Sequence, residues 1–338
     1  MLRLGHEVTI MTHADCELAE MFRQAGAKVI DFHPTSKWSR ADTKFIRETL
    51  LQGTYDFLHL FNSAAITTGV RAAKMLPVKV IIYRGFTGNV HWWAPYAYLK
   101  VLHPRVDRIH CLARSVKESI DAQAVFVRPK TVIIHKGHDP AWYDAITPLT
   151  REELNVPEDA FLVVCVANRR KMKGMPYLAK ALTLLPPELP VYTLFVGRDL
   201  DTPKVKRILE NHPNPSRIQF TGHRQDAWRI VKAADTFVLP SIYGEATTKA
   251  VIEAMALGVA PVITDIEGNR ELVRHEQEGL VVKRANPQAL ADGIQTLYAD
   301  PGLCARYAAA ARKHIETEFS SGETLQNLLA LYRELQPA

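Results

Sequence analysis

The feature that most limits how this chain can fold is the regular alternation of short apolar runs, rich in β-branched residues, with segments of helical character. The runs form two series along the 338 residues. The first series comprises residues 6–11, 57–61, 78–83, 108–112 and 131–135, and the second comprises residues 161–167, 191–196, 217–220, 236–239, 260–264 and 279–282. Strands that alternate with helices build parallel sheets covered by helices on both faces. The sequence therefore predicts an α/β protein with two parallel-sheet units.

The two series meet in a polar stretch, residues 137–160. Gly137, Pro140, Pro148 and Pro157 punctuate this stretch, and such residues are typical of loops and linkers. A chain of this length is also long enough for two domains that each bury a core. We therefore expect the link between the two domains to lie in residues 137–160.

Several protein classes do not fit the composition. The longest apolar stretches, residues 161–167 and 254–262, fall well short of the about 20 residues that cross a bilayer. Residues 1–20 lack the basic, apolar and small-residue succession of a signal peptide. The four cysteines form no Cys-x-x-Cys pair, which favours reduced thiols. The sequence therefore predicts a cytoplasmic protein.

The positive charge is concentrated in the first half of the chain. The formal net charge is +6, and residues 71–136 contain 12 Lys and Arg against three acids, Asp107, Glu118 and Asp121. Such a local field favours an anionic partner, either an acidic membrane surface, a phosphorylated acceptor or a nucleic acid. The segment lacks a recognisable nucleic-acid docking motif, so we expect no nucleic acid. A solvated basic face without a partner remains the alternative.

The strongest candidate for chemistry is residues 240–258. A strand that ends at Leu239 runs into a glycine turn, and a helix is predicted from about Thr247 to a cap at Gly258. The N-terminus of such a helix offers free N–H groups and partial positive charge to a phosphate. Glu245 and Glu253 would stand up to about 12 Å apart at about 1.5 Å per residue. That span suits a ligand longer than one ring, such as a sugar joined through a diphosphate to a ribose.

These residues resemble a known family. The two glutamates, separated by seven residues and followed by Ala-Met-Ala-x-Gly and then by Pro261 and Val262, resemble the signature of glycosyltransferase family 4. The resemblance implies a retaining enzyme with the GT-B fold, in which two Rossmann-like domains face each other across a cleft. It also implies that Glu253 holds the ribose and Glu245 the donor sugar, assisted by the backbone N–H groups of Ala246, Thr247 and Thr248. Two solvated glutamates on a surface helix are the alternative.

A second candidate is the loop of residues 166–174, directly after the first strand of the second series. It carries Arg169, Arg170, Lys171 and Lys173. Ligands of open α/β sheets bind beyond the carboxyl ends of the strands, so these cations should face the same crevice as Glu245. They would neutralise a diphosphate leaving group without a metal. The family resemblance assigns this role to Lys173 and to Arg169 or Arg170, and the spacing favours Arg170; a solvated basic loop is the alternative.

Shorter segments extend the resemblance. Residues 134–139 resemble the family's linker, residues 195–197 its strand-end glycine and residues 265–273 its downstream glycine loop and glutamate. The segment 220–223, with Gly222 and His223, resembles the loop that meets the nucleotide base. Residues 1–8 suggest the last turn of a helix, a Gly5 cap and a strand. We therefore expect the family's first strand and Gly-rich loop to be missing from this chain.

The acceptor side matches the family more loosely. Arg84 occupies the strand end where the family commonly has a histidine, and its guanidinium stays protonated at pH 7. It would bind a phosphate or a donor hydroxyl instead of acting as a base. His91 and His59 are nearby alternatives, although a lone histidine is more often structural. The aromatic run 87–100, which includes Trp92, would stack an acceptor sugar, rest on a membrane interface or pack on the domain core.

Other cofactor motifs are weak or absent. Asp199-Leu200-Asp201 fits the Asp-x-Asp pattern of metal-dependent glycosyltransferases, but any acidic loop matches so short a pattern. No Gly-x-Gly-x-x-Gly follows a strand, and no Gly-x-Ser-x-Gly occurs. We expect no metal and no cofactor, with the nucleotide sugar as a substrate.

Together these features predict a GT-B protein in three parts. Residues 1–145 would bind the acceptor, residues 146–315 the nucleotide sugar, and the last helix, within residues 316–338, would cross back to the first domain. The predicted activity is a retaining hexosyltransferase for glycan, lipopolysaccharide or glycolipid synthesis, located in the cytoplasm or peripherally on the inner face of the membrane. The alternatives are a GT-B sugar-nucleotide epimerase and a non-catalytic protein that binds a sugar nucleotide or an anionic surface.

Overall fold

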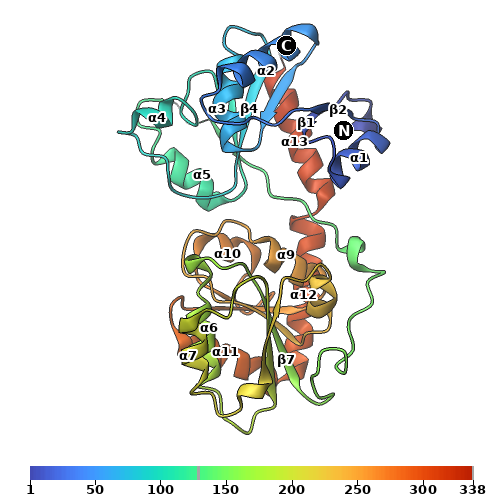
Figure 1. Cartoon of the computed structure of the whole chain (residues 1–338), viewed down its shortest axis with the longest axis vertical. Coiled ribbons are helices and arrows are strands. Elements are labelled where there is room, and N and C mark those ends of the chain that lie inside the picture. The colour runs from blue at the N-terminus through green and yellow to red at the C-terminus, as the bar shows by residue number, and fades with distance from the viewer. Residues whose placement is uncertain (128–129, 337–338) are drawn as a thin grey trace.

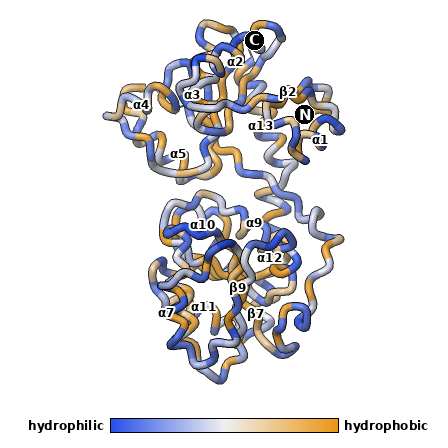
Figure 2. Tube along the Cα trace, in the orientation of Figure 1, coloured by the Kyte–Doolittle hydropathy of each residue, from blue (hydrophilic) through white to orange (hydrophobic). Residues whose placement is uncertain are grey.

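The structure is a computed structural model that describes residues 1–127 and 130–336. It consists of two Rossmann-like α/β domains, one above the other in Figure 1, with the linker running between them. Figure 2 shows hydrophobic residues gathered along the central strands of each domain and hydrophilic residues on the outer loops. The predicted fold class is therefore confirmed.

The N-terminal domain contains two separate parallel sheets. The larger one has the order β3-β4-β5-β6. Its strands are β3 (Phe57–Leu60), β4 (Lys79–Arg84), β5 (Arg108–Cys111) and β6 (Thr131–Ile133). The helices are α1 (Glu17–Gln24), α2 (Arg40–Gln52), α3 (Ser63–Ala72), α4 (Pro95–Tyr98) and α5 (Arg114–Asp121). Each strand of the larger sheet overlaps a predicted apolar run.

The smaller sheet pairs β1 (Thr9–Thr12) with β2 (Lys28–Asp31). A short 3₁₀ turn, η1 (Leu2–Leu4), precedes it and ends at Gly5, whose φ of 82° is left-handed. The predicted order of turn, glycine cap and strand is therefore confirmed. The sequence analysis missed β2, because only two apolar residues stand between its polar ends and its residues are half-buried or exposed.

The C-terminal domain has one six-stranded parallel sheet, in the order β12-β11-β10-β7-β8-β9. Its strands are β7 (Phe161–Val166), β8 (Val191–Val196), β9 (Ile218–Gly222), β10 (Thr236–Leu239), β11 (Ala260–Thr264) and β12 (Leu280–Val282). The helices that cover it are α6 (Met175–Leu182), α7 (Pro203–Leu209), α8 (Ala227–Lys232), α9 (Lys249–Ala256), α10 (Glu267–Leu272) and α11 (Pro287–Ala299). The strand order reverses between β7 and β10, so a ligand crevice is expected beyond the carboxyl ends of these two strands.

Burial explains why this sheet reads as nearly continuous apolar runs. All residues of β10 and β11 are buried, and β7 is buried except at its two ends. One apolar cluster, including Leu162, Phe237 and Met255, fills one side of the sheet, and another, including Phe195 and Leu178, fills the other. A parallel sheet covered on both faces leaves no polar side for its central strands.

The chain ends in two helices, α12 (Pro301–Glu318) and α13 (Ser321–Leu335), drawn in red in Figure 1. Helix α13 crosses to the N-terminal domain, where the rings of Tyr332 and Phe57 stack with centroids 4.5 Å apart. Leu331 and Leu335 pack with Ile81 and Ile134 of that domain. The structure thus places the last helix on the N-terminal domain, as the sequence predicted.

A buried polar chain lies where α13 meets the N-terminal sheet. The Nδ1 atom of His59 lies 3.3 Å from the hydroxyl of Tyr332, and its Nε2 atom lies 3.4 Å from Nδ1 of His110. The Nε2 atom of His110 lies 2.9 Å from the carbonyl oxygen of Ile134. Burial, together with the neighbouring His110, lowers the pKa of His59 to about 3. His59 is therefore neutral at pH 7, and its two ring nitrogens lie near Tyr332 and His110.

Over the described residues, none of the helices combines the length and the apolar character needed to cross a bilayer. The four cysteines are free, and Cys111, Cys165 and Cys304 are buried.

Candidate functional site

The loop after β10 and helix α9 form the centre of the site. The helix begins at Lys249, two residues later than predicted, because Thr248 is its N-cap residue. Gly258 ends the turn with a left-handed φ of 74°, as expected for the predicted cap. Thr247 is 7% exposed, and its hydroxyl has no hydrogen-bond partner among the described residues. A buried hydroxyl without a partner at a helix N-terminus is suited to a ligand that brings acceptor oxygens.

Lys173 and Glu245 form a buried ion pair. The Nζ atom of Lys173 lies 2.5 Å from Oε1 of Glu245, and their side chains are 11% and 10% exposed. The buried Ser241 hydroxyl donates a second hydrogen bond of 2.9 Å to the same carboxylate oxygen. The structure thus brings together a cation and a carboxylate that the sequence predicted to face one crevice.

Backbone packing explains why these two loops meet. Gly174 has a φ of 68°, and a Cβ atom on it would lie 2.0 Å from the carbonyl oxygen of Pro240. The amide of Ile242 donates a hydrogen bond of 2.8 Å to the carbonyl oxygen of Met172. The loop after β7 therefore lies directly against the loop after β10, which a side chain at position 174 would prevent.

The other cations of this loop have a different environment. Arg169, Arg170 and Lys171 are exposed, and none of them forms an ion pair with a described residue. Only Lys173 turns inward, at the end of the 3₁₀ turn η3 (Lys171–Lys173). Of the four cations predicted to face the crevice, Lys173 is buried and Arg169, Arg170 and Lys171 face solvent.

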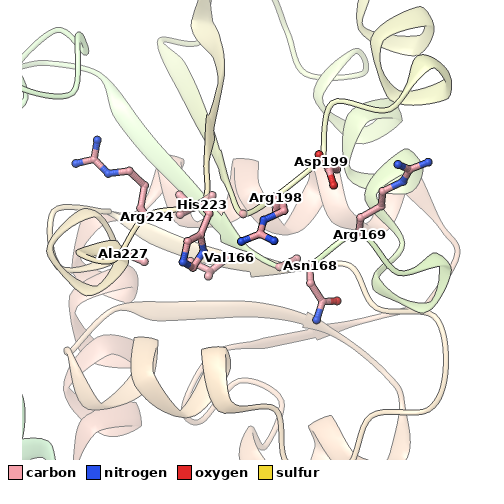
Figure 3. Close-up of a pocket in the computed structure, with 11 residues that line it drawn as sticks. Val166, Asn168, Arg169, Arg198, Asp199, His223, Arg224 and Ala227 are labelled. Atoms are coloured by element: carbon pink, nitrogen blue, oxygen red, sulfur yellow. The ribbon is translucent and has the colours of Figure 1, made fainter. Parts of the chain in front are cut away.

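A pocket of about 410 Å³ lies beyond the carboxyl ends of β7, β8 and β9. Figure 3 shows His223 and Arg198 side by side in it, with Asn168 and Arg169 toward one end and Arg224 at the other. Gly197 and Ala167 line the pocket with their backbones in close contact, because a Cβ atom at Gly197 would lie 1.8 Å from the carbonyl oxygen of Ala167. His223 was predicted here, and the preceding Gly222 has a left-handed φ of 67°.

Two residues that line the pocket, Arg198 and Arg224, were not predicted from the sequence. Arg198 follows directly on the strand-end glycine, and that position was the signal that could have revealed it. It forms no ion pair with a described residue, whereas Arg224 donates two hydrogen bonds of 2.8 Å to Asp226. Arg198 therefore has free donors for an anionic or carbonyl-bearing ligand, and the donors of Arg224 are partly used.

The Asp-x-Asp segment does not act as one unit. Asp199 lines the pocket, and Asp201 forms an ion pair of 2.8 Å with Lys206. No group of three or more His, Cys, Asp or Glu side chains that could hold a metal ion occurs within residues 1–127 and 130–336.

Glu253 lies beside the interdomain linker. Its carboxylate is 3.0 Å from Nζ of Lys249 and accepts a long hydrogen bond of 3.5 Å from the hydroxyl of Tyr143. That hydroxyl lies 2.8 Å from Nε2 of His138. Burial and the Glu253 carboxylate raise the pKa of Tyr143 above its usual range, so its hydroxyl remains a donor. The two glutamates of the signature thus have different partners, the buried Lys173 for Glu245, and the exposed Lys249 with the buried Tyr143 for Glu253.

On the acceptor side, Arg84 contacts its own loop. Its side chain is 8% exposed, and its guanidinium donates hydrogen bonds to the carbonyl oxygens of Phe86, at 3.1 Å, and Gly88. The guanidinium also lies 3.7 Å from the centre of the Phe86 ring. Burial lowers the pKa of Arg84 to about 10, so it stays charged at pH 7. Arg84 therefore uses its Nε and Nη2 donors within its own loop.

His91 and Trp92 belong to a solvent-facing aromatic group. The ring of His91 stacks on Trp93, and Trp92 meets Phe126 edge-on at 5.9 Å. Trp92 is 44%, Trp93 65% and Phe126 71% exposed. Of the alternatives left open for this run, packing on the domain core does not apply to the exposed rings of Trp92, Trp93 and Phe126.

Comparison with known proteins gives two family matches. The model described as Glycosyltransferase Family 4 matches residues 1–142, and the model described as Glycosyl transferases group 1 matches residues 147–314. Among curated proteins, the lipopolysaccharide core biosynthesis glycosyltransferase LpsD of Rhizobium meliloti is 27% identical over 55% of this chain. The match spans 53% of LpsD, so the chain covers about half the length of this relative.

Solved structures share the fold across nearly the whole chain. A glycosyltransferase from Rickettsia africae has a TM-score of 0.84 at 22% identity, covering 99% of this chain and 91% of the other. HepE from Anabaena, solved in complex with UDP and glucose, has a TM-score of 0.77 at 20% identity, covering 96% of this chain and 91% of the other.

Proposed function

The chain belongs to the glycosyltransferases with the GT-B fold, and on this premise we propose that it is a retaining hexosyltransferase that uses a nucleotide sugar as donor. It would move a sugar from a nucleotide-diphosphate sugar to the hydroxyl of a glycan or lipid-linked acceptor. LpsD is named for lipopolysaccharide core biosynthesis, which supports glycan or lipopolysaccharide synthesis as the setting.

One observation carries the proposal: a single loop joins the pocket to the buried ion pair. Residues 166–169 line the pocket, and Lys173 of the same loop contacts Glu245. A ligand that fills the pocket therefore extends toward the ion pair and the N-terminus of α9. A nucleotide sugar has the matching order of groups, with the base in the pocket at Gly222 and His223, the diphosphate near Lys173 and the sugar at Glu245.

Each part of the donor has a partner in this arrangement. We assign the diphosphate to Lys173, Arg170 and Arg169, with the hydroxyl of Thr247 and the amides of Ala246 and Thr248. We assign the ribose to Glu253. The ribose would reach this carboxylate by displacing the exposed side chain of Lys249. Three cationic side chains then balance the negative charge of the diphosphate, so the proposal needs no metal.

The proposed transfer proceeds on one face of the sugar. The bond between the anomeric carbon and the diphosphate oxygen breaks as the acceptor oxygen bonds to the same carbon. The departing phosphate oxygen takes the proton of the acceptor hydroxyl. Lys173 exchanges the Glu245 carboxylate for the diphosphate as negative charge builds on it, and Glu245 then holds sugar hydroxyls. No carboxylate is assigned as a nucleophile.

The proposal is tested by the melting temperature of the protein with UDP, GDP, ADP and their sugars. A ligand at about 100 times its dissociation constant should stabilise the chain by about 2.7 kcal/mol. We expect one base to raise the melting temperature and the Glu253→Ala variant to lose most of the shift. Glu276→Ala, on an exposed turn of the same domain, is the matched control and should keep it.

Two results would count against the proposal. If no nucleotide raises the melting temperature, the proposed donor site is wrong. A shift with conversion to a different free sugar nucleotide, without any acceptor, would favour the epimerase alternative, and binding without turnover on any acceptor would favour the non-catalytic one.

A second part of the proposal concerns the exposed aromatic group around Trp92. Trp92, Trp93, Tyr96 and Phe126 lie within or beside the basic segment 71–136. Aromatic rings settle at the headgroup level of a bilayer, and basic residues favour anionic lipids. We propose that this face rests on the cytoplasmic surface of a membrane. The wild-type chain should sediment with anionic vesicles at low salt, and the double variant Trp93→Ala, Phe126→Ala should not. The membrane proposal is contradicted if the wild-type chain sediments equally well with neutral vesicles, or if it sediments with no vesicles.

A further inference from the structure

A glutamate of the C-terminal domain caps a helix of the N-terminal domain. The two oxygens of the Glu271 carboxylate accept hydrogen bonds from the amides of Arg114, at 2.7 Å, and Ser115, at 3.0 Å. These amides open helix α5, whose own N-cap residue, Ala113, has no side-chain oxygen to offer. A carboxylate at this position satisfies two free N–H groups and faces the positive end of the helix dipole.

The helix that carries Glu271 packs closely against the loop that carries Glu245. Glu271 lies on α10, and Gly268 in the first turn of that helix lies under the backbone of Glu245 and Ala246. A Cβ atom at Gly268 would be 2.2 Å from the carbonyl oxygen of Ala246 and 2.5 Å from that of Glu245. At this distance the helix and the loop have no room to move toward each other.

Two further contacts hold these elements in place, one between α10 and the end of β11 and one between the Glu245 loop and the N-terminal domain. The buried Asn269 donates a hydrogen bond of 3.2 Å to the carbonyl oxygen of Thr264 at the end of β11. The side chain of Ala246 packs into the apolar cluster of the N-terminal domain, which includes Val116 of α5. Glu245 therefore directly precedes a residue that packs on the N-terminal domain, and its backbone lies against the helix whose Glu271 binds the N-terminus of α5.

We propose that Glu271 is a positioning residue for transfer: by capping α5 through α10, it sets the position of Glu245 relative to the acceptor domain. This inference rests on the proposed function. Its physical basis is that donor groups all lie in one domain and the acceptor in the other. A contact that spans the two should therefore affect the transfer step and leave donor binding unchanged.

The test compares Glu271→Ala and Glu271→Gln with wild type, and uses Glu118→Gln as control. Glu118 is an exposed glutamate on α5 itself, so its replacement removes a negative charge from the same helix without touching the cap. We expect Glu271→Ala to lower kcat about 30-fold, with the donor dissociation constant within about twofold of wild type. Glu271→Gln keeps one acceptor oxygen and should recover to within about fivefold.

Small-angle X-ray scattering supplies a readout that does not depend on activity. Loss of the cap should increase the radius of gyration of the Glu271→Ala protein, while Glu118→Gln should match wild type. Unchanged kcat in Glu271→Ala overturns the inference, and so does a fall in kcat that comes with weaker donor binding and an unchanged radius of gyration. If wild type itself binds no nucleotide, the proposed function has failed, and the scattering difference still reports on the cap.

Discussion

Replacing Lys173 with alanine is expected to lower the free energy of unfolding by about 3 kcal/mol and to reduce kcat about 10³-fold. The stability loss follows because the Glu245 carboxylate, 10% exposed, would remain buried with the Ser241 hydroxyl as its remaining donor. The loss of activity follows because Lys173 is the one inward-facing cation of its loop proposed to meet the diphosphate. Urea unfolding and steady-state transfer measure the two effects separately.

A double-variant cycle separates stability from catalysis. Glu245→Gln removes the charge that Lys173 balances, so Lys173→Ala combined with Glu245→Gln should regain most of the lost stability while remaining inactive. Lys171→Ala, two positions earlier and exposed, is the control and should leave both properties near wild type. If Lys173→Ala unfolds like wild type, or if the stabilised double variant still transfers sugar, the roles given to this pair are wrong.

Acidification from pH 7 to pH 4 is expected to remove about 3 kcal/mol of unfolding free energy through His59 alone. The pKa of His59 is lowered from 6.5 to about 3 by burial and by His110. Between these values the unfolded chain binds a proton that the folded chain does not. The contribution is therefore fully present above about pH 6.5, and stability falls as the pH drops toward 3.

The histidine variants isolate this contribution. The unfolding free energy is measured at pH 7 and at pH 4 for wild type and for His59→Phe. Wild type should lose about 3 kcal/mol more than His59→Phe between these pH values, because phenylalanine does not titrate. The exposed His6→Gln variant should keep the wild-type dependence. If His59→Phe and wild type lose the same unfolding free energy on acidification, the His59 ring of the wild type is already charged, or is not buried, at pH 4. Since His59 contacts Tyr332, we expect acid to release helix α13 first.

Most of the strand pattern was predictable from local sequence. The apolar runs that became β7, β8, β10 and β11 are buried on both faces, and this burial is why they contain almost no polar residues. Strand β2 escaped prediction because a half-exposed strand of four residues leaves only two apolar positions.

The spacing of the site motifs was also predictable, but their contacts were not. Glu245 and Glu253 lie where the signature placed them, yet Glu253 turns toward Tyr143 of the linker, 110 positions earlier. Arg84 ends its strand as expected, but its donors are used by Phe86 and Gly88. Glu253 and Tyr143 are far apart in the sequence, and the contacts of Arg84 depend on the conformation of one loop. Neither kind of contact produces a periodic pattern in the sequence.

The sequence by itself determined the α/β class, the two-domain organisation and the approach of two strand-end loops to one crevice, because hydrophobic periodicity and the rule for parallel sheets are local. Only the tertiary structure decided which cation of residues 169–173 meets Glu245, that Arg198 enters the pocket, and that Glu271 caps α5. These outcomes depend on close backbone packing, at Gly174 against Pro240 and at Gly268 against Ala246. Such packing fixes side chains from distant segments within hydrogen-bond distance, and no pattern within one segment encodes it.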